Sequence, residues 1–145
     1  MTSLISQIPP ASADEAVAHF SNRLRFETDC SDVHYSQQNG QVDYVLVDVR
    51  GTAAFANGHV PGAVNLPTKT ITTERLAEFP ADSLFVVYCA GPHCNGVHRA
   101  AARIAQLGYA VKEMIGGVTG WLDEGLSLSN TDIVQSTSTS ISCAC

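Results

Sequence analysis

The amino-acid sequence predicts an α/β protein with a parallel β-sheet flanked by helices. Two near-continuous runs of apolar and β-branched residues, "VDYVLVDVR" (42–50) and "SLFVVYC" (83–89), are typical of strands that are covered on both faces. A third strand is predicted over "YAVKEMIGG" (109–117). Helical patterns lie between these strands, and strands that alternate with helices indicate right-handed βαβ units in a parallel sheet.

Length, composition and charge limit the classes of protein to consider. The 145 residues suffice for one domain, and 45% hydrophobic and 15% charged residues are typical of a globular protein. The net charge is −6 with only eight scattered Lys and Arg residues, so we expect no nucleic-acid partner. The longest apolar runs are of strand length, so we expect no membrane span.

The start of the chain and its cysteines indicate a compartment. "MTSLISQIPP" lacks a basic start followed by an apolar core, so we expect no secretory signal and a cytoplasmic location. Thiols stay reduced there, and the five cysteines are therefore not interpreted as a disulfide framework.

The N-terminal region is predicted to hold one helix and a connector. Residues 12–25 form a helical pattern in which Ser12 or Asp14 can cap the first turn. Its apolar side chains fall on one stripe, formed by Ala16, Val17, Phe20 and Leu24. The following "FETDCSDVHYSQQNGQ" is predicted to be a polar connector that ends in an Asn-Gly turn, with Cys30 only filling space.

Further elements complete the predicted domain. Short helices are expected in "TAAFANG", "TTERLAEFP" and "VTGWLDEG", a short strand in "AVNL", and a longer helix over 96–107. Trp121 is expected in the core. The Ser- and Thr-rich segment after residue 128 is predicted to be a mobile tail. The predicted organisation is an N-terminal helix and connector (1–37), one α/β domain (38–128) and a tail (129–145).

The segment "YCAGPHCNGVH" (88–98) carries the most chemistry. Cys89 is the last residue of a predicted strand, and ligands of open α/β folds bind at the carboxyl ends of strands. The loop then enters a helix, whose first amide groups and positive dipole end favour an anion. A cysteine in such a loop has a stabilised thiolate and can act as a nucleophile.

Several segments together resemble the single-domain rhodaneses, which are sulfurtransferases. The resemblance lies in "LVDVRGTAAFANGHVPGAVNLP", "VVYCAGP" and "RAAARIAQLGYAVKEMIGGVTGWLDEG", in this order over about residues 40–127. It implies the rhodanese-like α/β fold, with a parallel five-stranded sheet flanked by helices, here with an N-terminal helical extension. It also implies a cysteine that takes sulfane sulfur from a donor, becomes a persulfide and passes the sulfur to a thiophilic acceptor, without a metal or organic cofactor.

Two cysteines compete for the role of the nucleophile. Cys89 keeps the nucleophile at the strand end but needs a loop about two residues longer than the family's usual one. Cys94 matches the family's spacing from cysteine to arginine through "CNGVHR" but needs a loop about three residues shorter. We favour Cys89, with Cys94 as the alternative nucleophile, as a resolving thiol that forms a disulfide with Cys89, or as a buried small hydrophobe.

The residues around the two cysteines form the predicted substrate loop. Its members are Ala90, Gly91, Pro92, His93, Asn95, Gly96 and Arg99. The six residues after Cys89 hold no Arg or Lys, although members of the family that use thiosulfate tend to place one there. A persulfide or polysulfide is therefore at least as plausible a donor as thiosulfate.

Three further residues are predicted to support the site. Asp48 and Arg50 end a strand at the same edge of the sheet, where an ion pair that holds the loop is expected. His59 occupies the family's usual histidine position and is expected to bond to the backbone and organise a turn.

Other chemistries fit the sequence less well. Zinc binding lacks the paired short spacings of zinc modules. Tyrosine phosphatases have five residues between cysteine and arginine, whereas Cys94 and Arg99 have four between them. The terminal Cys143 and Cys145 could receive sulfur or bind metal, but a tail without function is expected.

The sequence therefore predicts a cytoplasmic sulfurtransferase that acts on a small sulfur-donor anion or persulfide and a thiol or protein acceptor. A homodimer is compatible with the sequence, although no feature requires it. The alternatives are a catalytically weak rhodanese-like binding or regulatory module and a thiol redox switch formed by Cys89 and Cys94.

Overall fold

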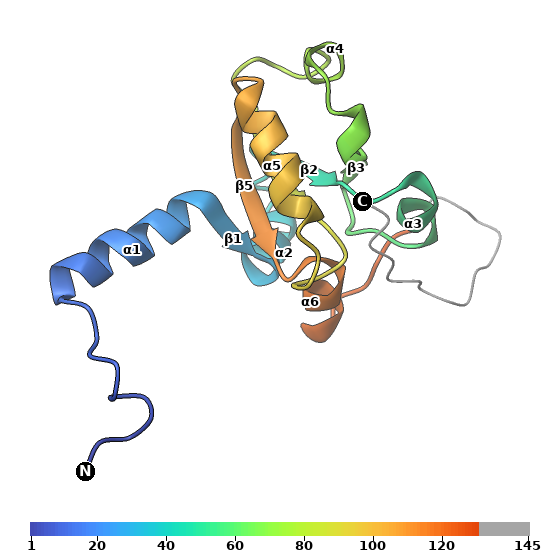
Figure 1. Cartoon of the computed structure of the whole chain (residues 1–145). Helices are drawn as coiled ribbons and strands as arrows, with labels where there is room; N and C mark the ends of the chain where they lie inside the picture. The colour runs from blue at the N-terminus through green and yellow to red at the C-terminus, as the bar shows by residue number, and fades with distance from the viewer. Residues whose placement is uncertain (131–145) are drawn as a thin grey trace.

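The computed structural model describes residues 1–130 and contains one parallel five-stranded sheet in the order β1-β5-β4-β2-β3. Figure 1 shows helices on both sides of this sheet. The predicted α/β class and the parallel five-stranded sheet are thus confirmed. The strands are β1 (Glu27–Asp29), β2 (Val45–Asp48), β3 (Val64–Asn65), β4 (Leu84–Tyr88) and β5 (Ala110–Ile115). The helices are α1 (Ala13–Phe26), α2 (Cys30–Gln38), α3 (Thr52–Asn57), η1 (Thr68–Thr70), α4 (Thr73–Leu76), α5 (Gly96–Gln106) and α6 (Gly117–Asp123).

The central strand β4 separates two apolar layers. Phe85 and Val87 point to the layer under α5, where they pack with Ile104. Val86 and Tyr88 point to the opposite layer, where they pack with Trp121 of α6. Successive strand residues face opposite sides of a sheet, so this alternation explains why the whole run is apolar. Trp121 lies in the core, as expected, and its indole N–H donates to the carbonyl oxygen of Ser127 at 3.0 Å.

The segment predicted to be a polar connector is instead a strand and a helix. Residues 27–29 form β1, which pairs with β5 at the edge of the sheet, and α2 begins directly afterwards. The Asp29 carboxylate accepts the amide of Asp32 at 2.8 Å and caps α2. Within α2, only Cys30 and Val33 are buried. A three-residue strand and a helix with two buried residues leave almost no apolar periodicity, so the sequence pattern did not reveal them.

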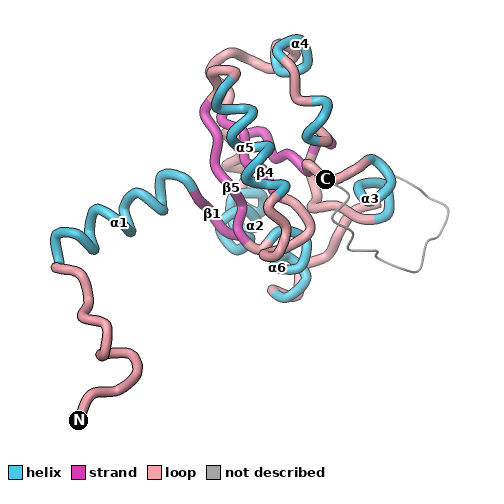
Figure 2. Tube along the Cα trace, in the orientation of Figure 1, coloured by secondary structure: helices cyan, strands magenta, loops and turns pink. Residues whose placement is uncertain are grey.

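The N-terminal helix projects from the rest of the molecule. Figure 2 shows α1 as a separate arm, with residues 1–12 continuing beyond it. The helix begins at a capping box, in which the Ser12 hydroxyl accepts the Glu15 amide and the Glu15 carboxylate accepts the Ser12 amide, both at 3.2 Å. The predicted helix over 12–25 is therefore present, but none of its side chains is buried.

Two predictions concern the end of the chain and the membrane. The predicted tail over 129–145 lies outside the described residues except for Ser129 and Asn130, and the cysteines at 143 and 145 lie outside them as well. Ser129 is not mobile as predicted, because it exchanges backbone hydrogen bonds of 2.9 and 2.8 Å with His59. Within residues 1–130, no helix is both long and apolar enough to cross a membrane.

Candidate active site

The two loop cysteines lie side by side at the carboxyl end of β4. Cys89 directly follows the strand, and Cys94 comes shortly before α5. Their Sγ atoms are 2.8 Å apart. Cys89 is 2% exposed and Cys94 is 9% exposed, so the pair lies beneath the surface, with Cys94 nearer to solvent. The residues between them include Pro92 and His93, which are exposed.

The start of α6 fixes the backbone of the loop over residues 89–95, which we call the cysteine loop. The amide of Val118 donates to the carbonyl oxygen of Cys89 at 3.1 Å, and the amide of Thr119 donates to that of Ala90 at 2.9 Å. The first amides of a helix have no partner within the helix, so the loop carbonyls satisfy them. Because C=O and N–H of a trans peptide point in opposite directions, the amides of Ala90 and Gly91 point away from these bonds to α6.

Two glycines allow this close approach. Gly117 has φ +57°, and a Cβ there would lie 2.3 Å from the carbonyl oxygen of Cys89. A Cβ on Gly91 would lie 2.6 Å from the Thr119 hydroxyl. The Thr119 hydroxyl also donates to the carbonyl oxygen of Ala90, at 3.2 Å. The cysteine loop and α6 therefore form one tightly packed unit, which was not predicted from the sequence.

A buried ion pair lies beside this unit. Asp48 and Arg50 are 0% and 1% exposed, and their closest atoms, Arg50 Nη2 and Asp48 Oδ2, are 2.7 Å apart. Arg50 Nε contacts both carboxylate oxygens at 3.1 Å, and Nη2 also donates to the carbonyl oxygen of Gly58 at 2.6 Å. Asn65 donates to the carbonyl oxygens of both partners. The expected ion pair is present, and it connects β2 to the turn after α3.

His59 and Tyr88 organise the neighbouring turn. His59 Nδ1 lies 2.8 Å from the carbonyl oxygen of Phe55, and the imidazole stacks on the Phe55 ring at 3.8 Å. The Tyr88 hydroxyl accepts the amide of Val60 at 3.0 Å. Burial and the nearby Asp48 carboxylate raise the pKa of Tyr88, so this phenol stays protonated. Both side chains hold backbone in place.

The basic residues expected near the loop differ in their surroundings. His93 and Arg99 are exposed, whereas Nε2 of His98 lies 3.0 Å from the Glu113 carboxylate on β5. His98 is thus directed toward β5, which lies between β1 and β4 in the sheet. Asn95 ends the loop in an exposed position, and Gly96 begins α5 in a buried one.

Cys30 contacts the same unit from the other side, which the sequence interpretation missed. Its thiol is directed at the carbonyl oxygens of Ile115 and Gly117, at 3.6 and 3.7 Å. Burial, followed by the negative charges of Asp29 and Glu124, raises the pKa of this thiol to about 11. Cys30 therefore stays a neutral thiol at physiological pH and packs against the backbone that enters α6.

Among residues 1–130, no three His, Cys, Asp or Glu side chains gather in a group that could hold a metal ion.

The parallel five-stranded sheet, with a cysteine loop between its central strand and α5, agrees with the rhodanese-like fold expected from the sequence. The family model of the rhodanese-like domain matches residues 31–124, and the chain belongs to this family.

Several similar proteins share about a third of their aligned residues with this chain. A sulfurtransferase of Allochromatium vinosum is 36% identical over 87 residues, which are 59% of this chain and 78% of that protein. The thiosulfate sulfurtransferase GlpE of Haemophilus influenzae is 35% identical over 89 residues, covering 60% of this chain and 81% of GlpE. The HTH-type transcriptional regulator Rv0324 of Mycobacterium tuberculosis is 33% identical over 96 residues, but the match spans only 42% of that regulator.

A solved structure extends the likeness over most of the chain. The BH2092 protein of Bacillus halodurans superposes with a TM-score of 0.79 at 33% identity, covering 87% of this chain and 96% of that one. Together with the family match over residues 31–124, this superposition confirms the rhodanese-like fold with helices around the sheet.

Proposed function

We propose that the protein is a sulfurtransferase in which Cys89 carries sulfane sulfur as a persulfide. The observation that carries the proposal is the buried cysteine pair at the carboxyl end of β4, with its Sγ atoms 2.8 Å apart. The names of the relatives from A. vinosum and H. influenzae support sulfur transfer as the class of reaction.

In the first step, the Cys89 thiolate attacks the outer sulfur of a donor. A bond forms between Cys89 Sγ and this sulfur, and the donor leaves with the electron pair of the broken S–S bond, as a thiolate from a persulfide or as sulfite from thiosulfate. The amides of Ala90 and Gly91, which point away from α6, and the first turn of α5 supply dipoles that favour a persulfide anion. In the second step, an acceptor thiolate attacks the outer sulfur and releases Cys89 as a thiolate.

Cys94 is placed to compete with the acceptor. Its thiolate can attack Cys89 Sγ, form the Cys89–Cys94 disulfide and release the outer sulfur as hydrosulfide. The two cysteines are oxidised by two electrons and the sulfane sulfur is reduced to sulfide. An external dithiol must then reduce the disulfide before the next cycle. Cys94 is thus a resolving thiol in this proposal, and the alternative nucleophile if Cys89 does not load.

The test is intact-protein mass spectrometry after brief exposure to thiosulfate and, separately, to a small persulfide. Wild type, Cys89→Ser and Cys94→Ser are compared, with Cys30→Ser as a matched control that removes a buried thiol outside the loop. We expect a lasting added sulfur on Cys94→Ser and none on Cys89→Ser. On wild type and on Cys30→Ser, we expect the added sulfur to give way to a species that lacks two hydrogens, with release of sulfide.

Other results would separate the alternatives. An adduct that disappears only in Cys94→Ser would make Cys94 the nucleophile. Disulfide formation by an oxidant without any sulfur adduct would indicate the redox switch, and a failure to react in either way would indicate a binding module.

A further inference from the structure

The N-terminal helix α1 exposes an apolar stripe that no part of residues 1–130 covers. The stripe consists of Ala13, Ala16, Val17, Phe20 and Leu24, which fall within about 100° of each other around a helix of 3.6 residues per turn. Val17, Phe20 and Leu24 are 66%, 58% and 73% exposed. A helix of this length is marginal in water unless an apolar face packs against something.

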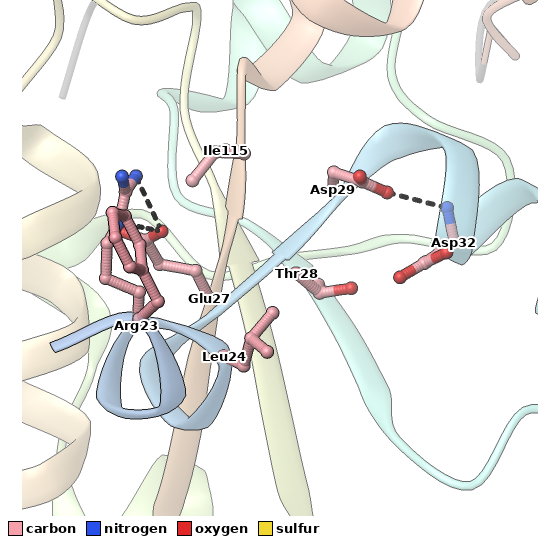
Figure 3. A pocket seen from close by; sticks show the side chains of 8 residues that line it. Arg23, Leu24, Glu27, Thr28, Asp29, Asp32 and Ile115 are labelled. Atoms are coloured by element: carbon pink, nitrogen blue, oxygen red, sulfur yellow. Dashed lines mark hydrogen bonds and ion pairs between the residues drawn. The ribbon is translucent and has the colours of Figure 1, made fainter. Parts of the chain in front are cut away.

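A cavity continues the stripe onto the body of the protein. It has a volume of about 280 Å³ and lies where α1 meets β1, the first turn of α2 and the end of β5. Figure 3 shows Leu24 and Ile115 on its apolar wall, next to the contact between Arg23 and Glu27. Ile115 is itself 39% exposed, so the apolar surface extends beyond the helix.

We propose that this face binds a second copy of the chain, with the two α1 helices packed antiparallel about a twofold axis near Phe20. In this arrangement Phe20 meets its own counterpart, and the small Ala16 of one copy lies opposite the large Leu24 of the other. Such alternation of small and large side chains allows two helices to interdigitate closely.

The charges on α1 favour the antiparallel orientation. The first turn carries Asp14 and Glu15, and the last turn carries Arg23 and Arg25. On the flank of the stripe, Asp14 of one copy faces Arg25 of the other, and the twofold axis produces this pair twice. A parallel pairing would instead place like charges together.

A membrane surface fits the same stripe less well. Membrane-surface helices have a polar face rich in Lys and Arg, whereas the four charges of α1 cancel and the whole chain has a net charge of −6. This dimer is independent of the proposed sulfur transfer, because none of the residues that form it lies in the cysteine loop.

Sedimentation velocity of the full chain over a range of concentrations tests the proposal. We expect wild type to self-associate to a dimer, and Phe20→Asp to weaken the association at least about tenfold. Phe26→Asp is the matched control, because Phe26 is also 65% exposed on α1 but lies on the side away from the stripe. It should dimerise as wild type does.

A charge-exchange series tests the orientation. Asp14→Lys and Arg25→Glu should each weaken the dimer, and the double variant should restore it. Wild type that stays monomeric at all concentrations, or that binds anionic phospholipid vesicles through Phe20 without dimerising, would overturn the proposal. Equal weakening by Phe20→Asp and Phe26→Asp, or a double variant weaker than both single ones, would also overturn it. All variants should take up sulfur at Cys89 as wild type does if their domain is folded.

Discussion

A side chain at Gly117 would collide with the backbone of Cys89, because the position of its Cβ is 2.3 Å from the Cys89 carbonyl oxygen. The first turn of α6 approaches the cysteine loop this closely in order to bond its carbonyls. The geometry of the cysteine loop therefore depends on a residue that comes well after it in the sequence.

Gly117→Ala should lower the free energy of unfolding by more than about 3 kcal/mol, because a left-handed backbone and a collision with backbone atoms coincide there. Gly125→Ala is the control: its φ is +76° with nothing within 4 Å, so only about 1–2 kcal/mol of backbone strain is expected. Urea unfolding measures both. Similar losses in the two variants would mean that the contact with Cys89 is dispensable.

Arg50→Met should destabilise the fold by about 3–5 kcal/mol, because it leaves the buried Asp48 carboxylate without its partner. Arg75→Met removes an arginine from the exposed ion pair with Glu78 and should cost at most about 1 kcal/mol. Chemical denaturation at neutral pH compares them. A loss below about 1 kcal/mol in Arg50→Met would contradict the structural role of the pair.

Stability should fall at alkaline pH through Cys30. Its pKa is raised to about 11 in the folded protein from 9.0, so the folded state holds the proton more tightly than the unfolded state. The contribution of the Cys30 thiol to the free energy of unfolding is complete below pH 9 and is lost as the pH rises toward 11. Denaturation at pH 7, 9 and 10 should therefore show a steeper decline for wild type than for Cys30→Ala. Parallel pH profiles would show that Cys30 ionises equally in both states.

An added positive charge in the cysteine loop should raise the rate of sulfur transfer from thiosulfate relative to the rate from a persulfide. His93 is exposed in a loop that has no Arg or Lys in the six residues after Cys89, so His93→Arg should raise the rate with thiosulfate several-fold, and less so at high salt. Gln106→Arg, at the far end of α5, adds the same charge away from the loop. Intact-protein mass spectrometry measures the rate at which each donor adds sulfur to Cys89 in the two variants and in wild type. An equal gain in both variants would assign it to net charge alone.

The sequence predicted those parts of the fold in which burial requires nearly every residue to be apolar. Strands β2 and β4 are buried on both faces, so nearly every residue in them must be apolar. Strand β1, "ETD", pairs with β5 through its backbone, which places little demand on its side chains. The sequence pattern therefore did not predict it. The stripe on α1 was predicted correctly as a helical pattern, but periodicity cannot show whether the apolar face has a partner within the chain.

The candidate site was predictable in part for similar reasons. The strand-to-helix loop places Cys89 and Cys94 in one region, and the ion pair of Asp48 and Arg50 follows from their position at a strand end. Cys30 contacts the backbone around Gly117 only because α2 and α6 pack together, which is a tertiary relationship with no local signal.

The pairing of Glu27 with Glu113 has a consequence for the order in which the protein is made. A ribosome releases β1 long before β5, so this edge of the sheet cannot form until almost all of the described chain has left the exit tunnel. Pairings between such distant segments are slow to form. A nascent chain stalled before residue 110 would carry its first 29 residues without their strand partner, open to chaperones or to another unfinished chain.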